Sequence, residues 1–410
     1  MRKIAGILAV AALLCVTKNT ILNENRYTDS VSVCADAKII DEQKEVFTME
    51  NQGENALQVR AKSAYLMDYS TQTPMYAQRE NERLPIASMC KIMTLLLCFD
   101  AIDAGDLQME ETLRVSEKAA SMGGSQVFLE ANGEYKVREL LKSIVVCSAN
   151  DSCVAMAERL AGSERMFTEK MNEKAKSIGA ENTLFANCTG LPQEPQYSCA
   201  KDVAIMLKHL LAHKEYFEFG NVWMDKFSHP KGRITEITNT NKLIRFYDGC
   251  DGGKTGFTND AGFCLAATAK RKDMRVISVV IGETTSANRF EDVREMFDYA
   301  FAEYTTTAIV QKDVVLETRL KVNGGKIKEI EVFPKESIFA FYKRGQKGGY
   351  TIEYTFQKIK APISIGDEIG ELTVYKDGVE YAKVPLLSKT EVKKANFFDR
   401  MKDIARLWNK

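Results

Sequence analysis

The spacing of apolar residues changes period along the chain, and these changes mark out its elements. Helices are predicted at residues 88–105, 117–122, 137–147, 151–160, 163–177, 200–212 and 288–304. The signal is helical spacing of apolar residues at 137–147, an amphipathic pattern at 288–304, and a long apolar run of good helix formers after Ser88. Runs rich in apolar and β-branched residues predict strands at residues 64–69, 75–77, 262–269 and 274–282. Because strands flank a helical middle, we expect a mixed α/β (α+β type) unit with an antiparallel sheet and helices on both faces.

From about Asp313 the pattern changes to short alternating runs, divided by turns such as Asn323-Gly324-Gly325. Candidate strands lie at residues 314–317, 327–333, 337–341, 351–354, 369–375 and 381–387. Together they predict a small all-β sandwich domain over residues 312–388. No catalytic grouping of residues occurs there, so a spacer or docking role is the modest interpretation.

The last segment, residues 389–410, has a third pattern. Its large apolar residues fall on one helix face: Phe397, Phe398, Met401, Ile404 and Trp408. Residues 393–410 also carry six Lys or Arg and two Asp, a net charge of +4. A basic amphipathic helix with aromatic residues suits an anionic membrane surface, so we expect membrane association here. The alternative is a helix packed on its own protein.

Ser88 and Lys91 are the first candidates for chemistry. They lie three residues apart at the start of an apolar run, so they share a helix face and the amine can point at the hydroxyl. A serine becomes a nucleophile only when a neighbouring base takes its proton, and burial or a nearby cation lets a lysine act as that base. An isolated Ser-x-x-Lys is more often a serine cap followed by a surface lysine, because so short a motif matches by chance.

Two further motifs favour the catalytic interpretation. Ser148-Ala149-Asn150 follows the helix at 137–147, and Lys254-Thr255-Gly256 comes shortly before the strand at 262–269, which we take to continue from it. Ser-x-x-Lys, Ser-x-Asn and Lys-Thr-Gly, in this order and about 60 and about 100 residues apart, are the motif set of penicillin-binding proteins and serine β-lactamases. Each motif is weak alone, and the three together are specific.

More of the chain resembles one branch of that group, the low-molecular-weight D-alanyl-D-alanine carboxypeptidases. The resemblance covers roughly residues 60–390, and its stretches are 87–89, 122–125, 150–152, 185–191, 239–241 and 253–262. It implies a β-lactamase/transpeptidase-like catalytic domain over residues 61–306. It also implies a serine peptidase that removes the terminal D-alanine from peptidoglycan pentapeptides and is acylated by β-lactam antibiotics.

The resemblance also implies roles for individual residues. Ser88 would be the acyl-ester nucleophile and Lys91 its base, with Ser148, Asn150 and Lys254 completing the catalytic set. Substrate would be bound by Lys254, Thr255, Gly256, Phe257 and Arg289. In this scheme the N–H groups of Ser88 and Phe257 hold the oxyanion, Thr255 and Arg289 bind the terminal carboxylate, and the charge of Lys254 helps to keep Lys91 neutral.

This sequence departs from the family pattern at two positions, and two other functions stay open. Cys90 stands where Thr is common and Ala149 where Gly is common, which bears on rate rather than on reaction type. A class A β-lactamase would need a glutamate for deacylation, and the nearest candidate is Glu181. A catalytically inactive wall-binding homologue would keep the fold, but the intact motif residues argue against it.

The N-terminus is typical of an export signal. Arg2 and Lys3 precede a 13-residue apolar segment at residues 4–16, and Ala35-Asp36-Ala37 provides a cleavage site. We therefore expect a signal peptide at residues 1–37, a leader at 38–60, and a protein at the extracytoplasmic face of the membrane or in the cell wall. An uncleaved N-terminal anchor is the alternative, since polar residues 17–30 separate the apolar segment from the site.

Composition narrows the remaining choices. Lys plus Arg equals Asp plus Glu at 56 each, which gives no argument for a nucleic-acid partner. Export would allow disulfides, but the ten cysteines are scattered through predicted helices and strands, and we interpret most as small buried residues. The three histidines lie far from the motifs in sequence. We expect neither a metal nor an organic cofactor.

Overall fold

The computed structural model describes residues 57–410 except Lys347, Lys358, Arg400 and 402–410. The expected signal peptide (1–37), most of the leader (38–60), and Ile404 and Trp408 of the C-terminal helix lie outside the described residues. The described chain forms two compact units that divide between Thr306 and Thr307.

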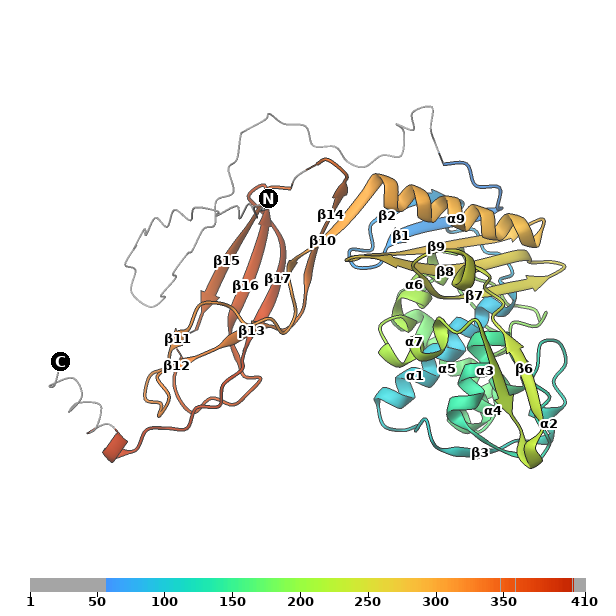
Figure 1. Cartoon of the computed structure of the whole chain (residues 1–410), viewed down its shortest axis with the longest axis horizontal. Coiled ribbons are helices and arrows are strands. Elements are labelled where there is room, and N and C mark those ends of the chain that lie inside the picture. Colours follow the sequence, from blue (N-terminus) through green and yellow to red (C-terminus); the bar gives the residue numbers. More distant parts are fainter. Residues whose placement is uncertain (1–56, 347, 358, 400, 402–410) are drawn as a thin grey trace, which may run out of the picture. The chain divides into compact units, whose positions relative to one another are not determined.

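The first unit is built on a five-stranded antiparallel sheet with the strand order β2-β1-β9-β8-β7. Its strands are β1 (Ser63–Asp68), β2 (Pro74–Gln78), β7 (Cys250–Thr258), β8 (Gly262–Arg271) and β9 (Met274–Glu283). Helix α9 (Ser286–Glu303) covers one face, and α6 (Ala200–Leu210) lies on the other (Figure 1). The expected antiparallel sheet with helices on both faces is confirmed.

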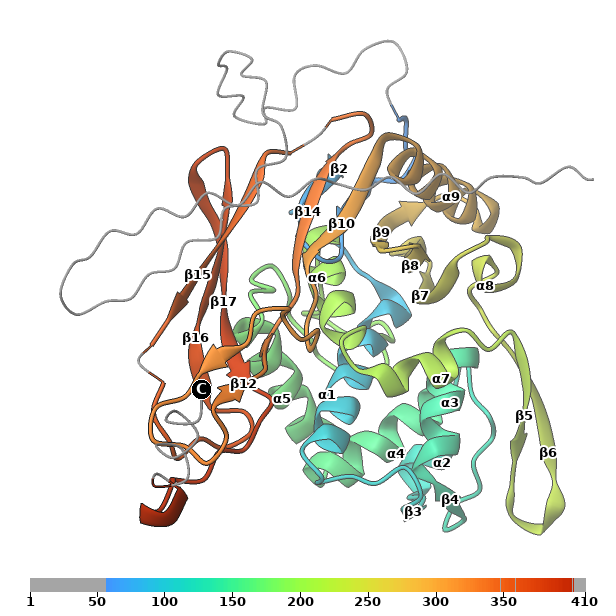
Figure 2. The same ribbon diagram turned by 60° about the vertical axis from the view of Figure 1, so that its left-hand side comes forward.

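Helix α1 (Lys91–Asp103) lies at the centre of the helical layer (Figure 2). It is apolar on nearly every side, and a helix with that pattern is stable only when other elements surround it. Here it packs against α3 (Val137–Cys147), α4 (Asn150–Ala161), α5 (Glu164–Ser177) and α6. The shorter helices of this unit are α2 (Glu117–Ala120), η2 (Lys214–Tyr216), α7 (Phe217–Gly220), η3 (Pro230–Gly232) and α8 (Leu243–Phe246).

Three features of this unit differ from the sequence-based prediction. Two hairpins were not predicted: β3 (Thr112–Arg114) with β4 (Glu134–Lys136), and β5 (Met224–Ser228) with β6 (Ile234–Thr238). The Lys-Thr-Gly motif does not continue into the strand at 262–269. It lies on β7, which turns back and pairs with β8. The motif therefore occupies the edge of the sheet, where one side of the strand is free of a partner strand.

The second unit is all-β, as expected. A four-stranded antiparallel sheet has the order β13-β17-β16-β15, from β13 (Val332–Pro334), β15 (Tyr350–Phe356), β16 (Glu368–Lys376) and β17 (Val379–Ser388). Strand β10 (Tyr304–Val310) pairs with β14 (Ile338–Lys343), and β11 (Leu320–Lys321) with β12 (Glu329–Ile330). Val310 and Ile338 pack on Leu372 and Leu386, which joins two layers through one apolar cluster. The strand expected at 314–317 is wrong, because these residues form irregular chain.

The C-terminal segment differs in its boundary from the expected helix over 389–410. Residues 389–395 run along the β unit, where Val392 pairs with Ile363 and Lys394 with Gly325. Val392 is fully buried in the same cluster as Ile363 and Ile369, which explains why the chain stays extended there. Helical residues begin at Phe397. None of the helices in the described part of the chain has the length and apolar character needed to cross a bilayer.

Candidate active site

Ser88 lies in a 3₁₀ turn, η1 (Ala87–Cys90), that leads directly into α1. Lys91 begins α1, and its Nζ donates a hydrogen bond to Ser88 Oγ at 2.9 Å. The Lys91 side chain is fully buried, so the amine has been removed from water. The predicted meeting of hydroxyl and amine on one helix face is therefore present in the structure.

Two glycines pack closely against the backbone of the turn that carries Ser88. A Cβ on Gly190 would lie 2.0 Å from the Ala87 carbonyl oxygen, and Gly190 has φ +79°. A Cβ on Gly256 would lie 2.6 Å from the Ile86 carbonyl oxygen and 3.2 Å from Ser88 N. Ala87 itself has φ +47°, a left-handed conformation that costs a non-glycine residue energy and persists only under constraint. Strand β7 and the 187–190 turn supply that constraint from two sides.

The Lys91 amine has a second acceptor, the Thr189 carbonyl, at 2.5 Å. Thr189 belongs to a turn that is also bonded to α1 by Thr94 Oγ1, which donates to the Cys188 carbonyl at 2.7 Å. Lys91 therefore lies between the nucleophile on one side and a fixed backbone oxygen on the other.

Ser148 and Asn150 lie where α3 meets α4. Ser148 ends α3 with φ +66°, and Asn150 is the first residue of α4. Asn150 Nδ2 donates to the Gly123 carbonyl at 2.7 Å, and its backbone N–H donates to the Ser125 carbonyl at 2.7 Å. Within the described part of the chain, Ser148 Oγ and Asn150 Oδ1 are buried and have no hydrogen-bond partner. Buried polar atoms of this kind are rare, and both are open to a hydrogen bond from a ligand.

Asp151 holds the loop that positions Asn150. Its fully buried carboxylate accepts hydrogen bonds from the N–H groups of Val127, Leu129 and Ser152. Burial raises the pKa of Asp151, and the backbone donors oppose that shift. Through these bonds the 123–129 loop is fastened to α4, the helix that Asn150 begins.

Lys254 of the Lys-Thr-Gly motif is almost completely buried, with 2% of its surface exposed. Its Nζ donates to the Thr255 carbonyl at 3.1 Å. Burial, and next the nearby charge of Lys91, lower the pKa of Lys254 well below its usual value of 10.5. The expectation that the charge of Lys254 helps to keep Lys91 neutral stays a prediction.

Thr255 and Phe257 extend the motif along β7. Thr255 Oγ1 donates to Thr240 Oγ1 at 2.8 Å, which links the strand to the 239–241 stretch. Phe257 is half exposed, and its ring stacks on that of Phe263 with centroids 4.3 Å apart. The motif thus offers a buried amine, a bonded hydroxyl and an accessible aromatic ring in succession.

Arg289, on α9, reaches the backbone of the same strand. Its Nη1 donates to the Gly256 carbonyl at 3.1 Å and to the Cys264 carbonyl at 3.4 Å. Burial lowers the pKa of Arg289 to about 10, so the guanidinium remains charged at neutral pH. Among the described residues, its buried Nε has no partner.

The thiols beside the motifs are unsuited to nucleophilic attack. Cys90 Sγ donates to the Asn187 carbonyl at 3.3 Å, and burial raises the pKa of the Cys90 thiol. Burial raises the pKa of Cys147 to about 11. The eight described cysteines are unpaired, and no group of three or more possible metal ligands occurs among the described residues.

Several contributors to the site were missed by sequence reasoning. They are Thr189, Asn187, Gly123, Ser125, Thr240 and Asp151. Each falls in a stretch already noticed for its resemblance to the carboxypeptidases, but no role followed from it. The reason is physical: the Thr189, Gly123 and Ser125 contributions are backbone carbonyls, which leave no mark on side-chain identity.

A half-buried serine bonded to a buried lysine amine, beside an edge strand that carries a second buried lysine, defines a serine acyl-transfer enzyme of the penicillin-binding class. The sequence profile described as D-alanyl-D-alanine carboxypeptidase, peptidase S11, matches residues 48–285. That of the penicillin-binding protein 5 C-terminal domain matches residues 304–394. The chain belongs to the peptidase S11 family of D-alanyl-D-alanine carboxypeptidases.

Individual relatives agree with this assignment. The chain is 43% identical to the D-alanyl-D-alanine carboxypeptidase DacF of Bacillus subtilis, over 85% of this chain and 90% of the relative. It resembles the crystal structure of penicillin-binding protein 5 from Haemophilus influenzae at a TM-score of 0.65 and 27% identity, covering 83% and 100% of the two chains. It also resembles ampicillin-bound penicillin-binding protein D2 from Listeria monocytogenes, at TM-score 0.54 and 29% identity, covering 60% and 99%.

Proposed function

We propose that this protein removes the terminal D-alanine from peptidoglycan stem peptides through an acyl-enzyme on Ser88. One observation carries the proposal: the buried Lys91 amine lies 2.9 Å from Ser88 Oγ. An amine in that position can take the hydroxyl proton as Ser88 attacks the carbonyl between the two D-alanines. Collapse of the adduct breaks the C–N bond, and water then releases the shortened peptide.

The remaining site residues take roles that their positions support. The N–H groups of Ser88 and Phe257 hold the oxyanion, because β7 lies against the Ser88 turn at Gly256. Ser148 Oγ carries the proton toward the leaving amine, and Asn150 Oδ1 accepts from the substrate amide. Lys254 and Thr255 bind the substrate peptide at its C-terminal end, where the free carboxylate lies. The unpartnered Ser148 and Asn150 atoms are the ones these roles require.

The β-lactamase alternative has little support here. It needs a glutamate near the acyl-enzyme, and Glu181 is an exposed residue on the turn before Leu184. The segment over Lys91, residues 185–191, contains no Asp or Glu. We therefore expect an acyl-enzyme formed with a β-lactam to be long-lived.

Incubation with penicillin is expected to place one covalent adduct on Ser88, because the drug presents a strained amide to the same nucleophile. Mass spectrometry of the intact and digested protein measures it. Ser88→Ala should remain unlabelled, while Ser143→Ala should label normally, since Ser143 is a buried serine bonded to Ser152. Turnover of the drug within seconds, or an adduct on another residue, would refute the carboxypeptidase proposal.

Arg289→Ala is expected to lower kcat/KM for a peptide ending in free D-Ala-D-Ala by about 10- to 100-fold. Its guanidinium is bonded at Gly256, beside Thr255, and keeps an unpartnered Nε, so it can add charge where the terminal carboxylate binds. The loss should be much smaller for the same peptide with an amidated terminus. Arg294→Ala, an exposed arginine on the same helix, is the matched control. Equal losses on both substrates would mean that Arg289 only braces β7.

We further propose that the protein is exported and acts at the extracytoplasmic face of the membrane, held there by the helix that begins at Phe397. Phe397 and Phe398 are 71% and 74% exposed, and the surrounding segment is strongly basic. Large exposed apolar side chains beside basic residues suit the interface of an anionic membrane.

The double variant Phe397→Ser/Phe398→Ser is expected to bind vesicles containing anionic lipid about 10-fold or more weakly, because two aromatic side chains no longer enter the interface. Co-sedimentation with vesicles measures it. Val379→Ser, at another exposed apolar position of the same unit, should bind as the wild type does. A truncation tests the anchor only if it keeps residues up to Asn396. A shorter chain would lose Val392, which belongs to the buried cluster of the β unit. Unchanged binding of the double variant would refute the anchor.

A further inference from the structure

The turn formed by residues 187–190 reaches the nucleophile and its base together. Its Thr189 carbonyl accepts from Lys91 Nζ, and its Gly190 packs against the peptide between Ala87 and Ser88. The direction of the Lys91 amine therefore depends on where the Thr189 carbonyl points. Residues 185–191 form neither helix nor strand, so a ladder of backbone bonds does not set that direction.

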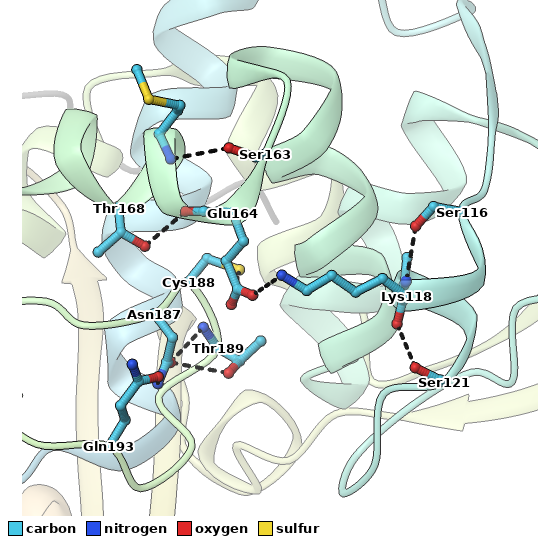
Figure 3. Close-up of polar contacts among 12 residues, drawn as sticks. Ser116, Lys118, Ser121, Ser163, Glu164, Thr168, Asn187, Cys188, Thr189 and Gln193 are labelled. Atoms are coloured by element: carbon cyan, nitrogen blue, oxygen red, sulfur yellow. Dashed lines mark hydrogen bonds and ion pairs between the residues drawn. The ribbon is translucent and has the colours of Figure 1, made fainter.

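The side chain of Asn187 holds this turn in shape. Its Oδ1 accepts from Thr189 N at 3.1 Å and from Thr189 Oγ1 at 3.1 Å (Figure 3). It also accepts from Gly190 N at 2.7 Å. Its Nδ2 donates to the Leu191 carbonyl at 2.9 Å and to Gln193 Oε1 at 3.3 Å. Asn187 is only 5% exposed, so few of these bonds could be replaced by water without cost. One buried amide thus binds residues on both sides of the Thr189 carbonyl.

Other contacts brace the turn without reaching Thr189. Cys188 Sγ donates to Glu164 Oε1 at 3.4 Å, and Glu164 Oε2 pairs with Lys118 Nζ at 2.7 Å (Figure 3). Gln196 Oε1 accepts from the N–H groups of Ala186 and Asn187. These bonds hold neighbouring parts of the segment, whereas the Asn187 side chain bonds Thr189 N and Gly190 N, which lie on either side of the Thr189 carbonyl.

We propose that Asn187 is a positioning residue for the base: by fixing the Thr189 carbonyl, it sets the rotation of the Lys91 amine. A neutral lysine amine has two N–H bonds and one lone pair. With one N–H given to Thr189, the lone pair can face Ser88 Oγ, and without that acceptor the amine is free to turn away. The inference rests on the proposed function, in which Lys91 takes the Ser88 proton.

The chain offers a closely matched control in Asn172. Its Nδ2 donates to the Phe185 carbonyl at 3.0 Å, and its Oδ1 accepts from Phe185 N at 2.8 Å. Asn172 is thus a second asparagine that bonds the backbone of the same segment, two residues before the turn and without a bond to Thr189. Asn172→Ala should lower the melting temperature and leave the chemistry unchanged.

The test compares second-order rates of penicillin acylation, measured from pH 6 to 10, with melting temperatures. Asn187→Ala is expected to acylate about 10- to 100-fold more slowly, with an altered pH profile, because a misplaced catalytic group costs that much. Asn187→Asp keeps the accepting oxygen and should recover part of the rate. Asn172→Ala should keep the wild-type rate and profile.

Several results would overturn the proposal. One is a folded Asn187→Ala variant with the wild-type acylation rate and pH profile. Another is an Asn172→Ala variant whose acylation rate falls as far as that of Asn187→Ala. If the alanine variant does not fold, Asn187→Gln replaces it in the test, because it displaces the same amide by one methylene. A folded glutamine variant with the wild-type rate and profile would overturn the proposal as well. Failure of the wild type to label on Ser88 would instead refute the proposed function.

Discussion

Lys91→Ala is expected to lower the acylation rate of Ser88 by penicillin about 10⁴-fold or more while the protein stays folded. Removing the base from a nucleophile–base pair has an effect of this size in serine hydrolases, because the remaining residues cannot take the hydroxyl proton. A quenched time course of labelling with a fluorescent penicillin measures the acylation rate. The residual rate of the variant should rise with pH, because hydroxide replaces the base.

The control for this variant is Lys142→Ala. Lys142 is also a largely buried helix lysine, but its Nζ donates to the Lys226 carbonyl and pairs with Glu139 and Asp225. That variant should lose stability and keep the wild-type labelling rate. If Lys91→Ala labels normally, Lys91 is not the base, and Ser148 or Lys254 must take that role.

Lys254→Met is expected to act in opposite directions on stability and on activity. The buried amine is costly to charge, so an apolar side chain of similar volume should raise the melting temperature by a few degrees, at about 2–4 °C per kcal/mol. The acylation rate should fall by about 10²- to 10³-fold, because the positive end of the site is lost. Calorimetry and penicillin labelling measure the two effects.

The gain in stability should depend on pH with a defined sign. The pKa of Lys254 is lower in the folded protein than its usual 10.5 in the unfolded chain. Between those two values the unfolded chain binds the extra proton, so the stability of the wild type rises with pH there. The advantage of Lys254→Met should therefore be greatest at the acidic end of this range and shrink as the pH approaches 10.5. A variant less stable than the wild type at pH 7 would contradict this account.

Periodic patterns predicted the long elements of the fold and missed the short or glycine-rich ones. Helices α3 and α5 carry apolar periods, whereas α1 and the β8–β9 hairpin carry continuous apolar runs. Strand β7 contains Gly252-Gly253 and Lys254, residues with weak strand preference. It is a strand because β8 offers a partner. The wrong strand at 314–317 shows the reverse case, where an apolar run makes single backbone bonds, such as Leu316 N to the Val332 carbonyl, and does not build a ladder.

The site was predictable to the extent that it consists of side chains in motifs. Ser88 and Lys91 could be paired from their spacing, because positions three apart share a helix face. Thr189 could not, since it meets Lys91 across a separation of 98 positions and contributes a backbone oxygen. The lowered pKa of Lys254 was also out of reach, because it depends on how completely the folded chain encloses the amine.

The glycines at 190 and 256 limit how this enzyme could evolve resistance to β-lactams. A useful resistance mutation must slow the reaction of Ser88 with the drug more than its reaction with the peptide. Any side chain at Gly190 or Gly256 would collide with backbone atoms of residues 86–88, at 2.0 Å and 2.6 Å, and would displace the nucleophile for both compounds. Phe257 is half exposed and can change without such a collision. Under drug selection we expect substitutions to accumulate at Phe257, while both glycines stay unchanged.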